Sequence, residues 1–425
     1  MHKKSILMIA PFAFYPPAGG GEIIIANNFK ALSQQYNIDL VIPQPDKDFY
    51  VKGLSHIQQF CQVHLIPVDL TPLPKISIFS RLARIITNLF SFSPIPGLDS
   101  FYNNDKVREL IRSDFVLIHL EFATWYHPSL RRRKGKLVLV EHNYEFEYWV
   151  GMGKSFFKSF KSLNSIPSIL SGYCWGLIYI LGSFKIRRQE KLAIRDADLV
   201  LCLTVRDKKS IQKYARSQGH VVSFKPGIHT DGYANTSKSG SIPSKDYINL
   251  AFVASFDMPQ NAHGARFFIE DIFPKLKDSP FNFKLNLVGR NPLPDLKELA
   301  LHDRDILLTG FVNDVRPYID QADIYVVPLM HGSGVRIKIM EAMAMGKPIV
   351  STSKGVEGLI FMTKGVIITD DSTAFANEII NLAGNSDLRL QLGKSNQRYA
   401  VENFDGKVNF SKEVLPLYTK ILDTH

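Results

Sequence analysis

Short apolar runs alternate with helix-like segments along the whole of this 425-residue chain. Strands of a parallel sheet that helices cover on both faces are apolar throughout, rather than at every second residue. Such strands alternating with helices indicate an α/β fold, and the chain is longer than a single core requires. We therefore predict two doubly wound, Rossmann-like domains. The predicted strands are SILMIA, IDLVIP, VHLIPV, FVLIHL, KLVLVEH and DLVLCLT in the first half, and INLAFVA, FKLNLVG, DILLTG, IYVVP and PIVST in the second.

A stretch that is poor in apolar residues, 233–247, separates the two halves of the chain. It is rich in Ser, Gly, Pro and Lys, a composition typical of linkers and surface loops. Just before it, Pro226 and Gly227 supply the turn chemistry that ends an element. We predict an N-terminal domain over 1–228 and a second domain over 229–404.

The net charge is +11, from 51 Lys and Arg against 40 Asp and Glu. This balance favours an acidic partner, whether a nucleotide, a nucleic acid or an anionic lipid. The basic residues are not interleaved with aromatic residues in a nucleic-acid-binding motif, so we expect no nucleic acid. Three scattered cysteines are too few for a disulfide framework or a metal-ligand cluster, and the N-terminal apolar run is too short for a signal peptide. These features favour a cytoplasmic protein.

Two segments raise the question of a membrane. Residues 162–184 carry no charge, but Pro and Gly interrupt them, and strands that should share one sheet flank them. A spanning helix would separate those strands, so we expect a buried or partly membrane-facing helix that continues to about residue 197. Residues 75–90 form a basic amphipathic pattern. This pattern fits a helix that lies on an anionic membrane surface, with the protein peripheral on the inner face of the cytoplasmic membrane. It fits equally a helix at the domain surface whose apolar side packs into the core.

Three glycines, Gly19, Gly20 and Gly21, stand between the first strand and a helix-like run. Glycine permits a close approach of the backbone, and the free N–H groups at a helix N-terminus attract phosphate. A flexible turn is the alternative. The spacing matches neither the dinucleotide fingerprint nor the P-loop, so it does not support an oxidoreductase or a P-loop enzyme.

His142 stands at the carboxyl end of a predicted strand. Ligands of open α/β sheets bind beyond this end, so its imidazole is placed to contact a sugar or phosphate, or to act as an acid or base. An interior histidine that its neighbours satisfy is the alternative. His119 ends another strand and carries a weaker version of the same argument.

The most informative segment is HGSGVRIKIMEAMAMGKP. A glycine-bracketed turn, Gly332–Gly334, lies between a strand and a helix, whose N–H groups and positive end suit a diphosphate. Arg336 and Lys338 add cations that can neutralise a leaving nucleoside diphosphate, and Glu341 suits paired ribose hydroxyls. An ordinary helix with both cations in solvent is the alternative.

Together these segments resemble retaining glycosyltransferases of family 4, which have the GT-B fold, and especially members that assemble bacterial polysaccharides. Further likeness is carried by PPAGGGE, INLAFVASFDMPQNAHGARFFIEDIFP, LNLVGRNP and LLTGFVNDVRPYIDQADIYVVPLM. The resemblance implies a nucleotide-diphosphate sugar bound mainly by the second domain, in a cleft that the first domain faces. It also implies no metal or other cofactor, and a last helix, about 405–425, that packs back on the first domain.

The resemblance assigns a role in donor binding or catalysis to individual positions. Phe311 and Val312 would meet the base, and Glu341 would bind the ribose. The turn Gly332–Gly334, with Arg336 and Lys338, would bind the diphosphate. His142 would lie beside the donor sugar, and Gly20 and Gly21 would form the loop near the phosphates.

The sequence departs from the family pattern at two places. Ser333 replaces the first glutamate of the family's glutamate pair, which usually contacts the donor sugar, so the sugar is undetermined. A basic pair after the first strand of the domain is replaced by SFDMPQN, residues 255–261. Because some cation must balance the leaving group, Arg336 and Lys338 become the expected diphosphate ligands.

We expect a retaining transfer of a sugar from this donor to a saccharide or lipid-linked acceptor, in the synthesis of a cell-surface polysaccharide or glycoconjugate. Because a fold does not fix a reaction, a nucleotide-sugar epimerase or hydrolase is an alternative. A catalytically weak scaffold subunit at a membrane is another, suggested by Ser333 and the basic segment 75–90.

Overall fold

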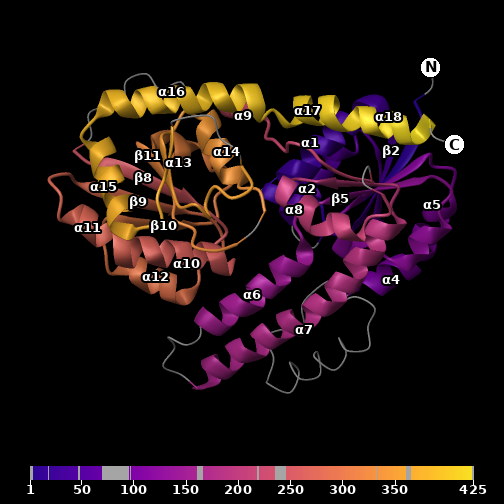
Figure 1. Ribbon diagram of the computed structural model, residues 1–425, viewed down its shortest axis with the longest axis horizontal. Coiled ribbons are helices and arrows are strands. Elements are labelled where there is room, and N and C mark those ends of the chain that lie inside the picture. The colour runs from indigo at the N-terminus through magenta and orange to yellow at the C-terminus, as the bar shows by residue number, and fades with distance from the viewer. Residues whose placement is uncertain are drawn as a thin grey trace. The chain divides into compact units, whose positions relative to one another are not determined.

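The computed structural model of the protein describes residues 3–17, 19–45, 48–68, 95, 97–159, 166–217, 220–234, 246–332, 334–359 and 365–423. By internal contacts the chain forms two compact units, the first made of residues 1–225 with 407–425 and the second of residues 226–406. Each unit has one parallel sheet with helices packed around it (Figure 1).

The first unit contains a sheet of seven parallel strands in the order β3-β2-β1-β4-β5-β6-β7. The strands are β1 Ser5–Ile9, β2 Asn37–Pro43, β3 Gln62–Ile66, β4 Leu117–Glu121, β5 Lys136–Glu141, β6 Leu199–Cys202 and β7 Val221–Ser223. The central strands are buried almost from end to end, which explains why their sequences are apolar without alternation. All except the three-residue β7 were predicted.

Helices of the first unit connect these strands, and α18 returns to the unit from the C-terminus. They are α1 Gly20–Gln35, α2 Asp48–Ile57, α4 Leu98–Asn103, α5 Asp105–Arg112, α6 Glu145–Ser159, α7 Ile166–Asp196, α8 Val205–Ile211 and α18 Leu415–Asp423, with the short α17 Gly406–Asn409 where the chain enters the unit. Short 3₁₀ turns are formed by Ala123–Trp125, Pro128–Arg132 and Gln212–Tyr214.

The second unit contains a sheet of six parallel strands in the order β10-β9-β8-β11-β12-β13. The strands are β8 Ile248–Val253, β9 Phe283–Val288, β10 Ile306–Gly310, β11 Ile324–Val327, β12 Ile349–Ser351 and β13 Val366–Ile368, of which only β13 was not predicted. The helices are α9 Thr230–Ala234, α10 Pro259–Phe267, α11 Phe273–Lys277, α12 Pro294–Leu301, α13 Arg316–Gln321, α14 Ile337–Ala344, α15 Ser372–Ala383 and α16 Ser386–Asn403. Both sheets run outwards in two directions from their first strand, which is the Rossmann order, so the predicted fold class is confirmed.

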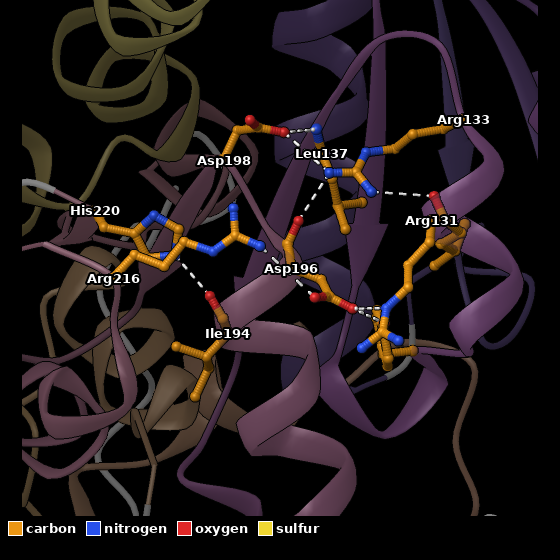
Figure 2. A network of polar contacts seen from close by, with 10 residues as sticks. Arg131, Arg133, Leu137, Ile194, Asp196, Asp198, Arg216 and His220 are labelled. Atoms are coloured by element: carbon orange, nitrogen blue, oxygen red, sulfur yellow. Dashed lines mark hydrogen bonds and ion pairs between the residues drawn. The ribbon is translucent and has the colours of Figure 1, made fainter.

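The basic run RRRKGK belongs to the scaffold of the first unit, as Figure 2 shows. Arg131 Nε donates a hydrogen bond to Asp196 at 2.6 Å, and Arg133 Nη2 donates one to Asp198 at 3.1 Å. The backbone N–H of Leu137 donates to the same Asp198 carboxylate at 2.8 Å. These bonds hold the end of α7 and the start of β6 against the amino end of β5, at the sheet edge opposite to the strands' carboxyl ends. The two aspartates thus serve the fold.

The uncharged segment 162–184 lies largely in α7, which continues through a charged half to Asp196, as predicted. None of the helices in the described part of the chain is long and apolar enough to cross a membrane. The basic segment 75–90 lies outside the described residues, so its contact with a membrane stays a prediction.

Candidate active site

The carboxyl ends of β4 and β5 bring three polar side chains of the first unit together. The two strands pair in parallel, so Glu121 at the end of β4 lies beside the end of β5, which His142 follows. Glu121 accepts hydrogen bonds from two histidines: His119 Nε2 lies 2.8 Å from Oε1, and His142 Nε2 lies 2.7 Å from Oε2. His119 and Glu121 are two residues apart in one strand and therefore share a face of the sheet.

Glu121 is ionised at neutral pH. Its side chain is fully buried, which by itself would raise the pKa, but the charges and hydrogen bonds of His119 and His142 lower the pKa to about 2. A carboxylate only accepts hydrogen bonds, so each imidazole nitrogen that faces it carries a proton. The side-chain amide of Asn28 donates a further hydrogen bond to Oε1 at 3.3 Å.

Tyr418 of α18 extends this set into a buried chain of hydrogen bonds. Its hydroxyl lies 2.5 Å from His119 Nδ1. In a neutral ring this nitrogen accepts a hydrogen bond from the hydroxyl, because Nε2 carries the ring proton and donates to Glu121. The chain thus runs from Tyr418 through His119 and Glu121 to His142. At its end, His142 Nδ1 is buried and has no hydrogen-bond partner among the described residues. This nitrogen can bind a polar group of a substrate.

Phe122 fixes the plane of the His142 ring. The two rings stack, with centroids 3.9 Å apart and an interplanar angle of 12°. Phe122 has a φ of +69°, which strains a non-glycine residue, and strain of this kind clusters at functional sites. Gly21, in the first turn of α1, adjoins the same phenyl group, since a Cβ there would lie 3.6 Å from its Cζ. Gly21 of the predicted loop and His142 are therefore both neighbours of Phe122.

Three further carboxyl groups, those of Glu141, Glu145 and Glu190, are buried in the same unit. Glu190 Oε1 accepts a hydrogen bond from the backbone N–H of Glu145 at 2.8 Å, and Glu141 Oε2 accepts one from that of Ala123 at 3.0 Å. Burial raises the pKa of Glu190 to about 7 and that of Glu145 to about 8, and raises that of Glu141 as well. In contrast to Glu121, these groups bind protons more readily than an exposed carboxyl group does.

In the second unit, the loop between β11 and α14 depends on two glycines. Gly332 has a φ of +116° and Gly334 a φ of +86°, in the region that favours glycine. A Cβ on Gly332 would lie 2.9 Å from Nη2 of Arg336, so the guanidinium packs where only glycine leaves room. Arg336 is 7% exposed and immediately precedes α14. The residue between the glycines, Ser333, lies outside the described residues.

Lys338, in the first turn of α14, contacts two uncharged groups and is attracted by the charge of Glu341. Its Nζ donates a hydrogen bond to Asn261 Oδ1 at 3.1 Å and lies 5.2 Å from the centre of the Phe252 ring. Burial, and then the positive charge of Arg336, lower the pKa of Lys338 to about 7. Arg336 is thus buried rather than solvated, and Lys338 is partly buried. A bound anion would relieve both effects and would be held for that reason.

Glu341, one turn further along α14, faces Tyr233 of α9. It is 8% exposed, and its Oε1 accepts a hydrogen bond from the Tyr233 hydroxyl. Burial raises the pKa of Glu341 to about 7, against the lowering effect of that hydrogen bond. Its neighbour Tyr233 comes from the segment whose composition indicated a linker.

Phe311 and Val312, the positions expected near the base, directly follow β10. Phe311 is 52% exposed and Val312 is partly exposed. The same loop is tied to α9, because Arg316 Nη1 donates a hydrogen bond to the carbonyl oxygen of Gly232 at 3.2 Å. The second unit thus links the β10 loop, α9 and α14 through hydrogen bonds.

Several polar partners were not predicted. Glu121 and Tyr418 complete the chain that ends at His142, while Asn261 and Tyr233 hold Lys338 and Glu341. Of these, only Glu121 could have been found from the sequence. It follows His119 by two residues in a predicted strand, and residues two apart in a strand lie on the same face. Among the described residues, no group of three or more His, Cys, Asp and Glu is placed to hold a metal ion.

Comparison with known proteins shows what this chain is similar to. Residues 248–385 match the family Glycosyl transferases group 1. A Klebsiella pneumoniae relative described as an uncharacterized 44.6 kDa protein in the cps region is 22% identical over 423 residues, 96% of this chain and 98% of that one. An uncharacterized glycosyltransferase of Methanocaldococcus jannaschii is 23% identical over 442 residues, 99% and 100% of the two chains. The amylovoran biosynthesis glycosyltransferase AmsK of Erwinia amylovora is 31% identical over 97 residues, 20% of this chain and 24% of that one.

The fold also has solved neighbours. The structure of Anabaena HepE in complex with UDP and glucose superposes with a TM-score of 0.64 at 15% sequence identity, over 98% of this chain and 100% of that one. Likeness over nearly the full length of both chains identifies the fold, with its two Rossmann-like domains, as GT-B.

Proposed function

Since the chain is a glycosyltransferase with the GT-B fold, we propose that it is a retaining enzyme of family 4. In this proposal it transfers a sugar from a nucleotide-diphosphate donor to a saccharide or lipid-linked acceptor, in the synthesis of a cell-surface polysaccharide or glycoconjugate. The place of the Klebsiella relative in a cps region and the amylovoran role of AmsK support the pathway class. A cytoplasmic enzyme, peripheral on the inner face of the membrane, would suit a lipid-linked acceptor.

One observation carries the donor assignment: two cations, Arg336 and Lys338, are packed together beside a turn that two left-handed glycines form. Their mutual repulsion and burial are relieved by an anion with more than one charge, which a nucleoside diphosphate provides. When the ribose replaces the Tyr233 hydroxyl as hydrogen-bond donor, the Glu341 carboxylate can accept hydrogen bonds from the ribose hydroxyls. Phe311 and Val312 would border the base. HepE was solved with UDP, so a UDP-sugar is the first donor to test.

In the proposed reaction the bond between the anomeric carbon and the diphosphate oxygen breaks, and a bond to the acceptor oxygen forms on the same face. The acceptor proton passes to the departing diphosphate oxygen, so atoms and charge balance. Arg336 and Lys338 stabilise the charge that develops on this oxygen, which is the task a metal ion has in other transferases. We therefore propose a reaction without a metal cofactor.

His142 is proposed to contact the donor sugar through Nδ1. Glu121 binds the opposite ring nitrogen and so sets which nitrogen faces the substrate, while Phe122 sets the plane of the ring. Gly20 and Gly21, of which Gly21 has Phe122 as a neighbour, would let the backbone approach the phosphates.

The test is to incubate the purified protein with UDP-glucose and other UDP-sugars, with and without saccharide and lipid-linked acceptors, and to follow nucleoside diphosphate and sugar products. Retaining transfer predicts acceptor-dependent release of UDP and a product with the donor's anomeric configuration. Free sugar without acceptor would instead identify a hydrolase, a changed sugar on intact donor would identify an epimerase, and binding without turnover would favour a scaffold subunit.

A further inference from the structure

Two adjacent residues of α7, Gln189 and Glu190, lie on the face of this helix that packs inside the first unit. Gln189 is fully buried and Glu190 is 1% exposed. Ile186 and Ala193 on the same face are apolar and fully buried, as is usual for the packed side of a helix. A buried polar side chain among apolar ones lowers stability unless its hydrogen bonds are made. The hydrogen bonds of these two side chains therefore indicate why they are polar.

Gln189 holds the loop that follows β4. Its side-chain amide nitrogen carries two protons, and it donates to the carbonyl oxygen of Thr124 at 2.8 Å and to that of Tyr126 at 2.7 Å. Both carbonyl groups belong to the chain that leaves β4 through Phe122, the residue with the strained φ. Gln189 thus fixes the path of the backbone directly beyond Phe122.

Glu190 holds the loop that follows β5. Its Oε1 accepts a hydrogen bond from the backbone N–H of Glu145 at 2.8 Å. Glu145 is the first residue of α6, and N–H groups in the first turn of a helix have no acceptor within that helix. His142 lies three residues before this point. Glu190 thus fixes the far end of the short loop that carries the imidazole.

The two loops are also joined to each other. The backbone N–H of Ala123 donates a hydrogen bond to Oε2 of Glu141 at 3.0 Å. These two residues directly follow Phe122 and directly precede His142, whose rings stack with centroids 3.9 Å apart. Side chains of neighbouring helix residues point about 100° apart, so one turn of α7 can reach the loops after two adjacent strands. The stacked rings are thus carried by two loops that are both anchored on α7.

We propose that Gln189 and Glu190 are positioning residues of the transfer reaction, which hold the loops after β4 and β5 so that His142 presents Nδ1 to the donor sugar. The inference rests on the proposed role of His142. The hydrogen bonds that carry it go to backbone groups, so the two side chains act through the loops and not on the substrate. A displacement of about 1 Å at a reacting group can lower a rate about 100-fold, which gives such anchors control of the rate.

Replacement of the two anchors one at a time, at nearly constant volume, tests the inference. Gln189→Met loses both amide protons and Glu190→Met loses the acceptor, whereas Glu190→Gln keeps an acceptor oxygen for the N–H of Glu145. Rates are measured below the melting temperature of every variant. We expect kcat to fall about 10- to 100-fold in both methionine variants and to stay within about threefold of wild type in Glu190→Gln. The KM for the donor should change little, because the donor is proposed to be bound mainly by the second unit.

A double-mutant cycle separates positioning of His142 from a general loss of structure. If the anchors act through the imidazole, Gln189→Met should cause little further loss of kcat in a His142→Ala background. Asn396 of α16 gives a matched control, because its buried side-chain amide also donates to two carbonyl oxygens, those of Lys347 and Gly365, both at 2.8 Å. Any effect of Asn396→Leu on kcat should add fully to that of His142→Ala. Losses that add in the same way for Gln189→Met would overturn the proposal.

The NMR signals of the His142 ring test the same inference without turnover. A phenyl ring shifts the proton resonances of a ring stacked on it upfield, and His142→Ala identifies the His142 signals in protein labelled at histidine. We expect upfield signals in the wild type, a return toward unstacked positions in Gln189→Met and Glu190→Met, and no change in Glu190→Gln or Asn396→Leu. Signals that keep the wild-type position in both methionine variants would overturn the proposal. If the signals move as expected but the wild-type protein transfers no sugar, the proposed function alone fails, so the two failures are distinguishable.

Discussion

The strand-end cluster of the first unit and the glycine loop of the second are both buried and charged, but they balance charge differently. Glu121 is compensated by two imidazoles and an amide, and a tyrosine closes the far end of the chain. Lys338 donates a hydrogen bond to an amide oxygen and lies over a phenyl ring, and it has Arg336 as a like-charged neighbour. The first cluster balances the charge of Glu121 within the fold, whereas the second gains from an anion.

This difference separates two kinds of contribution. A satisfied buried network adds stability and holds one group in a fixed orientation, so its loss should be felt first in folding. A site in which two cations repel each other adds little to stability, so its loss should be felt first in ligand binding. Four substitutions can break or sharpen this contrast.

Glu121→Ala should have the largest effect, because it leaves the His119 and His142 nitrogens buried without an acceptor. Removing one partner of a buried, hydrogen-bonded set costs about 3–5 kcal/mol of the free energy of unfolding. Urea unfolding measures it, with Glu109→Ala on the exposed face of α5 as the control. A loss no greater than that of the control would mean that the cluster does not stabilise the first unit.

Lys338→Ala should lower kcat by about 10²- to 10³-fold, the range found when one electrostatic stabiliser of a transition state is removed. Stability should change little, because a poorly compensated cation is lost. Release of UDP reports the rate, and Lys297→Ala on α12 is the matched exposed lysine. Activity equal to that of the control variant would remove Lys338 from the proposed site.

Glu190→Gln should reduce the loss of stability that the wild-type protein shows between pH 5 and pH 8. The folded pKa of Glu190, about 7, exceeds the unfolded value near 4.5, so the folded state keeps a proton that the unfolded chain releases. The stability from this proton is complete below about pH 4.5 and is lost as the pH rises through 7, by an amount on the order of 3 kcal/mol. Thermal unfolding from pH 5 to 8 should show a smaller decline in the variant, and parallel curves would contradict the assignment.

Lys338→Arg should have the smallest effect, confined to the pH dependence of binding. Because the pKa of Lys338 in the free protein is about 7, the dissociation constant for UDP should rise by up to about tenfold per pH unit above neutrality. Arginine stays charged over this range and should flatten the profile. Calorimetric titration between pH 7 and 9 compares the two proteins. An equally steep profile in the variant would assign the titration to another group.

The fold was predictable because parallel strands buried on both faces leave a continuous apolar record, which β7 and β13 are too short to show. Positions at strand ends and in turns were also readable, as with His142 and Gly332. Their partners were not, since they depend on tertiary placement: Tyr418 lies 299 residues from His119, and Tyr233 comes from a segment with linker composition. The burial of Lys338 was hidden as well, because a lysine in an amphipathic pattern gives no sign of what packs on it.

The central claim is that the glycine loop with Arg336 and Lys338 binds a nucleoside diphosphate. The direct measurement is the melting temperature of the wild-type protein and of Lys338→Ala with UDP-, GDP-, ADP- and CMP-sugars, because a ligand that binds the native state raises it. We predict that at least one diphosphate donor raises the wild-type melting temperature, that Lys338→Ala loses this shift, and that the CMP-sugar, with a single phosphate, has no effect. A flat response of the wild-type protein to every donor would contradict the claim.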